Sequence, residues 1–381
     1  MKLSHAALAL ALSSSLVLSA CTDSDDTEST DSVSSTTAAD GADDSTSTTG
    51  GTGDNATSTG DAAPTTGDAS TATGDAATST DDGKITAPAA GAGVISVEEA
   101  ESVAAQLMRT AADSQVVDVD EAAELNEQAF VGSELLAATA ATTLRDAGLT
   151  PVIDYAPSGA NVLAISRDDG ESPAFMVVQS VPESGLPELH LMVSQDGGEN
   201  WKIGWSAPML AGTKVGTFDP RSEGSTILRD TRGELSNYPS GVVDKLFEIL
   251  DYPFAEDRPD FRTNDYGPQV RKATEAQAAS VSEQATMTST HALRADTLRT
   301  IELEDGSAIM FPVLERTSAF DVKSGMILKP PTAFTHLTGD DTITDSAKMK
   351  TLVFLAVHIR TDGGAPEIIA AREQVVSASG S

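Results

Sequence analysis

The sequence has one cysteine, few basic residues and no apolar run of the roughly 20 residues that a membrane-spanning helix needs. A single cysteine excludes a disulfide framework and any cysteine-rich zinc or iron–sulfur site. Lysine and arginine total 24 against 58 aspartates and glutamates, which gives a formal net charge of −34. Because a nucleic-acid surface needs clustered lysine and arginine, we expect no nucleic-acid partner.

The common sequence signatures of catalysis are also absent. The chain has no Gly-x-Ser-x-Gly nucleophile elbow, no Gly-x-x-x-x-Gly-Lys phosphate loop and no His-Glu-x-x-His zinc helix. The four histidines after His5 are widely spaced, and each is expected to be a strand or surface residue: His190, His291, His336 and His358. We therefore predict no catalytic residue, no cofactor and no metal site, and we expect the protein not to be an enzyme.

Residues 1–21 have the pattern of an export signal that ends in a lipid attachment site. Lys2 precedes a run of about 15 apolar and small residues, which suits a signal peptide better than a membrane span. The run ends in Leu18-Ser19-Ala20-Cys21, which matches the lipobox of bacterial lipoproteins. An ordinary cleaved signal with a chance cysteine is the alternative. We predict a signal peptide over 1–20 and acyl chains, palmitate among them, on Cys21 that anchor an extracytoplasmic protein to the cell membrane.

Residues 21–93 are composed almost entirely of serine, threonine, aspartate, glycine and alanine, with no aromatic residue and no base before Lys84. Such a segment cannot bury enough apolar surface to offset the entropy of ordering, so it is predicted to be disordered. Thr-Gly-Asp recurs every seven residues over 52–75, but no leucine, isoleucine or valine occurs in the repeat, which argues against a coiled coil. A flexible tether of this length has an r.m.s. span of about 45–50 Å.

Residues 94–381 hold all the aromatic residues and are predicted to form an α+β structure. Ser96 and Glu99 form a capping box before a helix that runs to about Asp113. Asp120 and Ser133 are expected to cap the next two helices, the first ending near residue 130 and the second at Gly148. Short β-rich runs separated by turn residues follow, at 152–155, 161–167, 174–181, 188–194 and 201–206.

A similar order recurs in the last third of the chain. Ser240 is expected to cap one helix, and Pro268 suits the first turn of another that runs to about residue 285. Strands are then expected near 297–303, 307–317, 320–328, 350–360 and 366–377. The offset of 136–144 residues predicts two tandem domains, each made of helices and an antiparallel meander, at 94–232 and 238–381. No strand–helix–strand alternation indicates a doubly wound sheet.

Three stretches carry a resemblance to a known family: Gln-Ala-Phe-Val-Gly at 128–132, Gly-Trp-Ser-Ala-Pro-Met-Leu at 204–210, and the Asp305-Gly306 hairpin with the run 309–314. On these, residues 95–381 resemble a family of uncharacterised actinobacterial secreted lipoproteins with a two-part ectodomain. The element order resembles the nuclear-transport-factor-2-like or cystatin-like fold, in which helices pack into a curved antiparallel sheet. The resemblance implies no activity and no catalytic residue.

Residues 194–201 nearly match the Asp-box, Ser-x-Asp-x-Gly-x-Thr-Trp, which decorates β-propellers such as sialidases. One copy flanked by helices does not fit a propeller, so we predict a hairpin in which Asp196 bonds the turn backbone and Trp201 packs over it. Trp201 and Trp205 are also candidate ligand-binding residues, because the concave face of a curved sheet can line a pocket. The alternative is that both side chains belong to the core.

The leading functional hypothesis is a lipid-anchored module of the cell envelope that binds an envelope protein or a small ligand and is not an enzyme. Two alternatives stay open. One is a pocket enzyme, an isomerase or dehydratase, because relatives of the fold use histidine and aspartate in that way. The other is a structural spacer. A buried histidine–carboxylate pair in a deep pocket would favour the enzyme, an exposed apolar groove would favour binding, and filled domains would favour the spacer.

Overall fold

The computed structural model describes residues 92–381, apart from 146, 150–152, 154, 156–158, 169–172, 183–184, 229–234 and 295–297. The expected signal peptide, Cys21 and all of the expected tether up to residue 91 lie outside this range. Ala92 and Gly93, which the composition groups with the tether, bond to the folded part: Ala92 O accepts from Asp168 N, and Gly93 N donates to Ser222 O. In the described part, no helix combines the length and the hydropathy of a membrane span.

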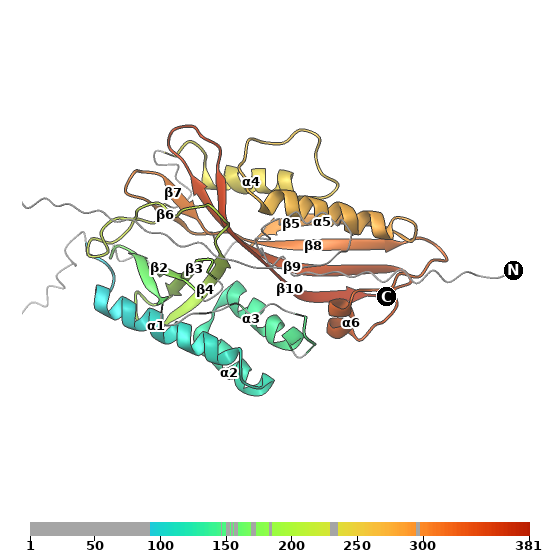
Figure 1. Ribbon diagram of the computed structural model, residues 1–381, viewed down its shortest axis with the longest axis horizontal. Coiled ribbons are helices and arrows are strands. Elements are labelled where there is room, and N and C mark those ends of the chain that lie inside the picture. Colours follow the sequence, from blue (N-terminus) through green and yellow to red (C-terminus); the bar gives the residue numbers. More distant parts are fainter. Residues whose placement is uncertain are drawn as a thin grey trace, which may run out of the picture. The chain divides into compact units, whose positions relative to one another are not determined.

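The first half is a set of three helices followed by a four-stranded antiparallel meander (Figure 1). The helices are α1 (Val97–Ser114), α2 (Val119–Ala129) and α3 (Gly132–Arg145). The strands, in the order β1-β2-β3-β4, are β1 (Asn161–Ile165), β2 (Ala174–Ser180), β3 (Glu188–Ser194) and β4 (Trp201–Pro208). The predicted α+β class and the predicted meander of this half are confirmed. The run expected at 152–155 falls partly outside the described residues.

The helix ends show where the cap predictions succeed and fail. Ser96 caps α1 as predicted, because its hydroxyl accepts from Glu99 N at 3.2 Å. The cap of α2 is Asp118 and not Asp120: the Asp118 carboxylate accepts from Glu121 N at 3.0 Å, which places Asp120 inside the first turn. The prediction that Ser133 caps α3 is also wrong, since the helix already begins at Gly132, whose φ of 60° precludes most side chains.

The second half differs from the predicted copy of the first. Two helices, α4 (Pro239–Leu250) and α5 (Tyr266–Val281), precede its sheet, and a short helix, α6 (Thr332–Thr338), interrupts it. Ser240 lies inside α4, because Pro239 occupies the first helical position and Tyr238 is the cap. The strands are β5 (Ala285–Leu293), β6 (Thr300–Glu302), β7 (Ala308–Met310), β8 (Val313–Val322), β9 (Ser346–Ile359) and β10 (Glu367–Gly380).

The second sheet is antiparallel but is not a meander. Its order is β5-β8-β9-β7-β6, with β10 on the free edge of β9. The 14-residue β9 pairs with β8 over residues 346–354 and with β7 over 357–359, so the β5–β8 pair and the β6–β7 hairpin share one of its edges. The strand expected at 320–328 is the end of β8, while β5 and α6 were not predicted. The expected three-helix, single-meander repeat is therefore wrong for this half.

A buried cluster joins the two sheets face to face. It contains Leu191 and Trp205 of the first sheet with Phe311, Phe354 and Ile369 of the second half. The edge of the Trp205 ring meets Phe311 with 5.1 Å between ring centroids. The opposite face of the first sheet packs on α1, and the opposite face of the second packs on α4. Residues 92–381 accordingly belong to one compact unit.

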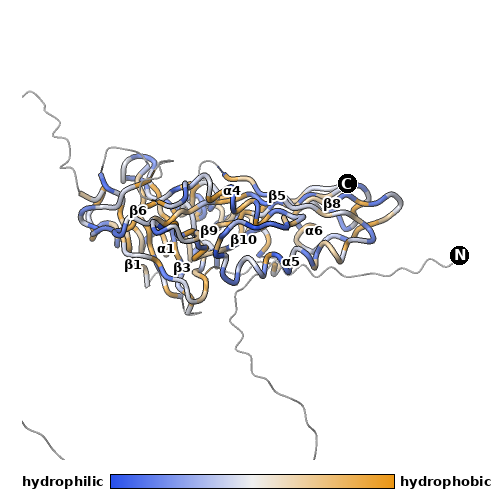
Figure 2. Tube along the Cα trace, turned by 90° about the horizontal axis from the view of Figure 1, so that it is seen from above, coloured by the Kyte–Doolittle hydropathy of each residue, from blue (hydrophilic) through white to orange (hydrophobic). Residues whose placement is uncertain are grey.

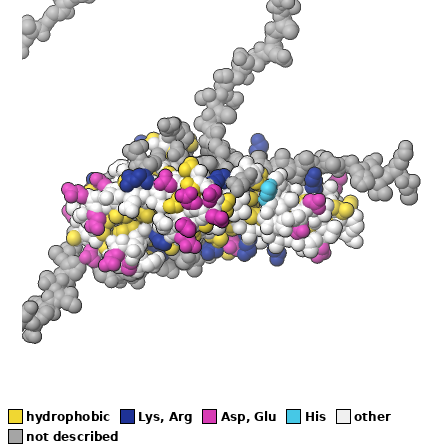
Figure 3. Space-filling model, turned by 90° about the horizontal axis from the view of Figure 1, so that it is seen from below, with side chains coloured by type: hydrophobic (Ala, Val, Ile, Leu, Met, Phe, Trp, Pro, Cys, Tyr) yellow, Lys and Arg dark blue, Asp and Glu magenta, His cyan; other side chains and the backbone are white. Residues whose placement is uncertain are grey.

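The distribution of side chains follows this arrangement. Hydrophobic segments of the Cα trace coincide with the strands and the inner sides of the helices, and hydrophilic segments with the connections (Figure 2). On the face drawn in Figure 3, acidic side chains lie among scattered basic ones over both halves.

Candidate functional site

The Asp-box-like hairpin between β3 and β4 has the predicted structure. The Asp196 carboxylate accepts from the backbone N–H groups of Glu199 at 3.3 Å and Asn200 at 2.9 Å. The hydroxyl of Ser194 donates to it at 2.6 Å, and this bond with those from Asn200 lowers the pKa of Asp196. Trp201 is buried, and its Nε1 donates to Gly198 O at 2.8 Å. The hairpin is thus held by its own hydrogen bonds.

The two candidate ligand-binding tryptophans do not converge. A β-bulge shifts the register of β3 and β4, so that Leu191 pairs with Trp205 but Met192 pairs with Ile203, and Gly204 is the extra residue. Because Gly204 is an extra residue, the side chains on either side of it no longer follow the regular alternation between the two faces of the sheet. Trp201 therefore packs in the cluster under α1, whereas Trp205 packs between the two sheets. No single site can use both rings.

Trp201 also borders an open groove of about 730 Å³ between α1, α2 and the hairpin. Three glutamates line the groove, Glu124, Glu127 and Glu199, together with Lys202. Within the described residues, no group of three or more histidine, cysteine, aspartate or glutamate side chains is placed to hold a metal ion. The groove is thus an acidic, solvent-exposed surface.

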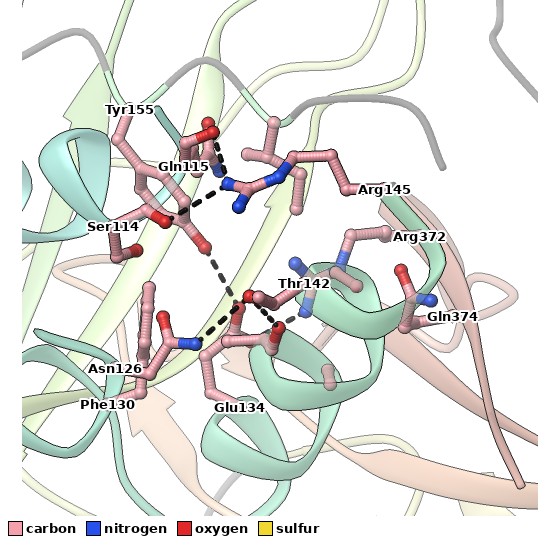
Figure 4. A pocket seen from close by; sticks show the side chains of 14 residues that line it. Ser114, Gln115, Asn126, Phe130, Glu134, Thr142, Arg145, Tyr155, Arg372 and Gln374 are labelled. Carbon is pink, nitrogen blue, oxygen red and sulfur yellow. Dashed lines mark hydrogen bonds and ion pairs between the residues drawn. The ribbon is translucent and has the colours of Figure 1, made fainter. Parts of the chain in front are cut away.

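A smaller and better enclosed pocket lies where the helices of the first half meet β10 (Figure 4). Its volume is about 50 Å³, which corresponds to a few water molecules at about 10–15 Å³ each. The apolar part of the wall comes from one face of α3 and from two neighbouring segments, and consists of Phe130, Ala137, Ala138, Ala141 and Ile153. The remaining lining is polar and comes from α1, α2, α3 and β10.

The floor of the pocket is a buried cluster of Glu134, Tyr155 and Arg372. Glu134 is fully buried; its Oε1 accepts from the Tyr155 hydroxyl at 3.0 Å and its Oε2 from Arg372 at 2.7 Å. Burial, with the Glu134 charge, raises the pKa of Tyr155 well above its ordinary value. Burial, the largest single effect, would lower the pKa of Arg372, but its interactions with Glu134 and Tyr155 together outweigh burial, and the pKa is raised. Arg372 therefore keeps its charge, and Tyr155 stays neutral.

The rim of the pocket is tied together by a second arginine. Arg145, in the last turn of α3, donates to the backbone oxygens of Ser114 at 3.2 Å, of Gln115, and of Val117 at 2.7 Å. These carbonyls follow the end of α1, where a helix leaves acceptors unpaired, so Arg145 closes that end. Asn126 of α2 donates to Thr142 Oγ1 of α3 at 3.2 Å. The three helices are thus fixed around the opening (Figure 4).

A buried histidine lies behind the floor. Both ring nitrogens of His190 bond serine hydroxyls, with Nε2 2.9 Å from Ser180 Oγ and Nδ1 3.0 Å from Ser206 Oγ. Burial, with Arg372 nearby, lowers the pKa of His190 to about 3. A Glu188 oxygen lies 3.9 Å from Nε2, which is beyond hydrogen-bond distance and does not offset the burial. His190 is therefore neutral, and its ring packs 5.7 Å from that of Tyr155.

The other histidines are strand or surface residues, as expected. His358 lies on β9 and bonds Ser307 Oγ at 3.0 Å, and His336 is exposed on α6. His291 on β5 is the one that meets a carboxylate, since its Nδ1 is 2.8 Å from Asp251 Oδ1. Its side chain is only 1% exposed, and burial lowers its pKa. His291 lines neither the groove beside Trp201 nor the pocket of Figure 4.

Sequence reasoning missed the pocket, although two signals for it were present. Glu134 lies three residues before Ala137 and seven before Ala141, on the otherwise apolar stripe of α3. Arg372-Glu373-Gln374 interrupts an apolar run in β10. Charged residues inside apolar patterns are buried only when they are paired, so both patterns indicate partners elsewhere in the chain. The sequence did not reveal that these two residues pair with each other.

Comparisons of the chain with protein-family models, with curated proteins and with solved structures gave no match.

Proposed function

We propose that the protein is a lipid-anchored, extracytoplasmic module of the cell envelope whose folded part binds a small, uncharged polar molecule in the pocket of Figure 4 and is not an enzyme. The observation that carries the proposal is the floor of that pocket. Its charges cancel within a buried pair, while Arg372 Nε has no hydrogen-bond partner among the described residues. A bound ligand would supply an acceptor for this N–H.

The lining specifies the class of ligand. Alanines 137, 138 and 141 with Ile153 provide an apolar wall, and the polar groups at the floor and rim provide donors and acceptors. Glu134 and Arg372 neutralise each other at the floor, so a charged ligand would gain no unpaired counter-ion there and would lose its hydration. Arg145, at the rim, already donates to backbone carbonyls. A small molecule with hydroxyl or amide groups fits both the volume and the chemistry.

Binding fits this pocket better than proton transfer. Both oxygens of Glu134 accept hydrogen bonds, Tyr155 holds its proton, and both nitrogens of His190 are bonded to serines. A general base must reach a substrate proton, and all three groups are instead held in place by hydrogen bonds to other protein groups. An isomerase or dehydratase would require the cluster of Glu134, Tyr155 and Arg372 to rearrange. A structural spacer would not need a pocket.

The remaining parts of the proposal come from the sequence. The lipobox at 18–21 supports export, cleavage before Cys21 and acylation of that residue. The composition of 21–93 supports a tether that separates the folded part from the membrane. The helix-plus-sheet composition of each half is compatible with nuclear-transport-factor-2-like or cystatin-like domains at 94–232 and 238–381, and with membership of the actinobacterial lipoprotein family.

The test uses a variant that reduces the volume of the pocket and leaves its charged residues unchanged. Ala138→Leu places three extra carbons against the wall, and Ala123→Leu on the exposed side of α2 is the matched control. Saturation-transfer NMR of the full-length protein with glycerol, acetamide and urea should show contact with at least one probe in the wild type and the control. Ala138→Leu should abolish it. Equal signals from all three proteins, or none from the wild type, would overturn the proposal.

A further inference from the structure

A second cavity, of about 100 Å³, begins at the first turn of α3. Consecutive residues of that turn line different cavities: Glu134 lines the pocket of Figure 4, and Ser133 lines this one. Its other polar lining residues are Gln195, Trp205 and Arg299. Gln195 is exposed, so the cavity reaches the surface.

Two buried polar atoms of the lining have no hydrogen-bond partner within the described chain. They are Ser133 Oγ and Trp205 Nε1, and each residue is only 1% exposed. Buried polar groups are nearly always paired, so two orphans on one cavity indicate that something else completes their hydrogen bonds. The β-bulge at Gly204 turns Trp205 toward this side of the sheet.

The hydrogen-bond donors that line the cavity indicate which kind of chemical group completes these hydrogen bonds. An indole N–H and a guanidinium can only donate hydrogen bonds, so the partner must be an acceptor. The N-terminus of the 14-residue α3 adds backbone N–H groups without intrahelical acceptors and the positive end of the helix dipole. Arg299, which is partly buried, also lines the cavity and carries a positive charge. An anionic oxygen is the acceptor that gains most from such a set.

We propose that this cavity is a binding site for a small oxyanion, the shared chemistry of a phosphate and a carboxylate group. Its oxygens accept from Trp205 Nε1, from Ser133 Oγ and from the first-turn N–H groups of α3, and Arg299 balances the charge. The site is separate from the pocket proposed for the neutral ligand, so either proposal can fail without the other. It also gives Trp205, but not Trp201, the ligand-binding role considered from the sequence.

The chain contains two tryptophans, which makes the test direct. In a ¹⁵N–¹H spectrum of the full-length protein, two indole signals are expected, and Trp201→Phe assigns them. Trp201 Nε1 is already bonded to Gly198 O and serves as the internal control. Inorganic phosphate and acetate are added in separate titrations at constant ionic strength. The Trp205 signal should shift saturably while the Trp201 signal stays in place.

A charge variant and its control complete the experiment. Arg299→Gln, which keeps hydrogen-bond donors but removes the charge, should weaken anion binding by about tenfold or more. Arg109→Gln, on the exposed side of α1, should leave the affinity unchanged. Saturation with phosphate alone identifies the phosphate form of the site, and saturation with acetate as well identifies the general oxyanion form. No saturable shift with either anion would mean that water alone fills the cavity, and the proposal would be wrong.

Discussion

Arg372 and Glu373 are neighbours on β10 and serve opposite faces of the second sheet, where each completes a buried cluster of arginine, glutamate and tyrosine. Arg372 pairs with Glu134 at 2.7 Å, and Tyr155 donates to the same carboxylate. Glu373 pairs with Arg316 at 2.7 Å and accepts from Tyr266 at 2.9 Å. Since successive strand residues alternate between faces, one dipeptide connects the pocket side of the sheet with the α5 side.

The Arg372–Glu134 pair predicts an asymmetric response to mutation. Arg372→Met should destabilise the protein by about 3–5 kcal/mol, because it leaves the Glu134 carboxylate buried without a counter-ion. Glu134→Leu combined with Arg372→Met should recover most of that loss, since no charge is left unpaired. Arg360→Met is the control: the Arg360–Asp362 pair is exposed, so its loss should change stability little. Urea denaturation measures all three; equal losses in the single and double variants would contradict the argument.

His190 predicts an acid-sensitive component of stability. Its pKa falls from 6.5 in the unfolded chain to about 3 in the folded protein, so between these values the unfolded state binds the extra proton. Stability from this group is complete above pH 6.5 and is lost as the pH falls, by roughly 1.4 kcal/mol per pH unit. His190→Gln keeps hydrogen-bonding capacity and removes the titration. The unfolding free energy of the wild type relative to the variant should fall by this amount for each pH unit between pH 6.5 and 3. A difference that does not change with pH would show that His190 is not the titrating group.

The Trp201 hairpin is predicted to be structural. Trp201→Ala should cost about 3–5 kcal/mol, because the ring is 6% exposed and packs over the turn. Trp201→Phe keeps most of the packing and loses only the bond to Gly198 O, so about 1 kcal/mol is expected. Thermal unfolding checks both values. A sialidase-type activity that disappears in Trp201→Ala without loss of stability would show that the Asp-box resemblance is functional.

Local patterns predicted the first sheet well, because each of its strands is an apolar run closed by turn residues. Strand β3 was predicted to the residue, and β2 and β4 to within two. Strand β5 was missed although its burial alternates, because Met287 is the one large apolar residue among its inward side chains, and the others are small or polar: Ala285, Ser289 and His291. The pocket could not be predicted from local patterns, since its ion pair joins residues 238 positions apart. Such a pairing depends on tertiary structure.

Acylation of Cys21 is predicted to retain the protein at the membrane. Cys21→Ala removes the thiol that accepts the lipid, while Ser24→Ala, just outside the lipobox, is the matched control. After labelling cells with palmitate, the wild type and the control should carry label and sediment with membranes, because two or more acyl chains anchor stably. The alanine variant should carry none. Label or membrane association that persists in Cys21→Ala would exclude this anchor.

The core shared by the two sheets predicts that both halves unfold together. Leu246 of α4 is fully buried in the second half and packs away from the first sheet, in the cluster of Val353 and Leu355. Leu246→Ala should cost about 2–5 kcal/mol. Both tryptophans lie in the first half, so their fluorescence reports its unfolding. If Trp205 and Phe311 couple the halves, Leu246→Ala will lower the midpoint seen by tryptophan.

The control for this measurement is Leu136→Ala, a 40% exposed leucine of α3 that should change the midpoint little. Independent halves would behave differently. The tryptophan transition would then be the same in Leu246→Ala as in the wild type, while far-ultraviolet circular dichroism would show a second, earlier transition. That result would favour two autonomous domains, 94–232 and 238–381. Coincident transitions by both probes would instead identify the sheet-to-sheet core as the element that makes the two halves one folding unit.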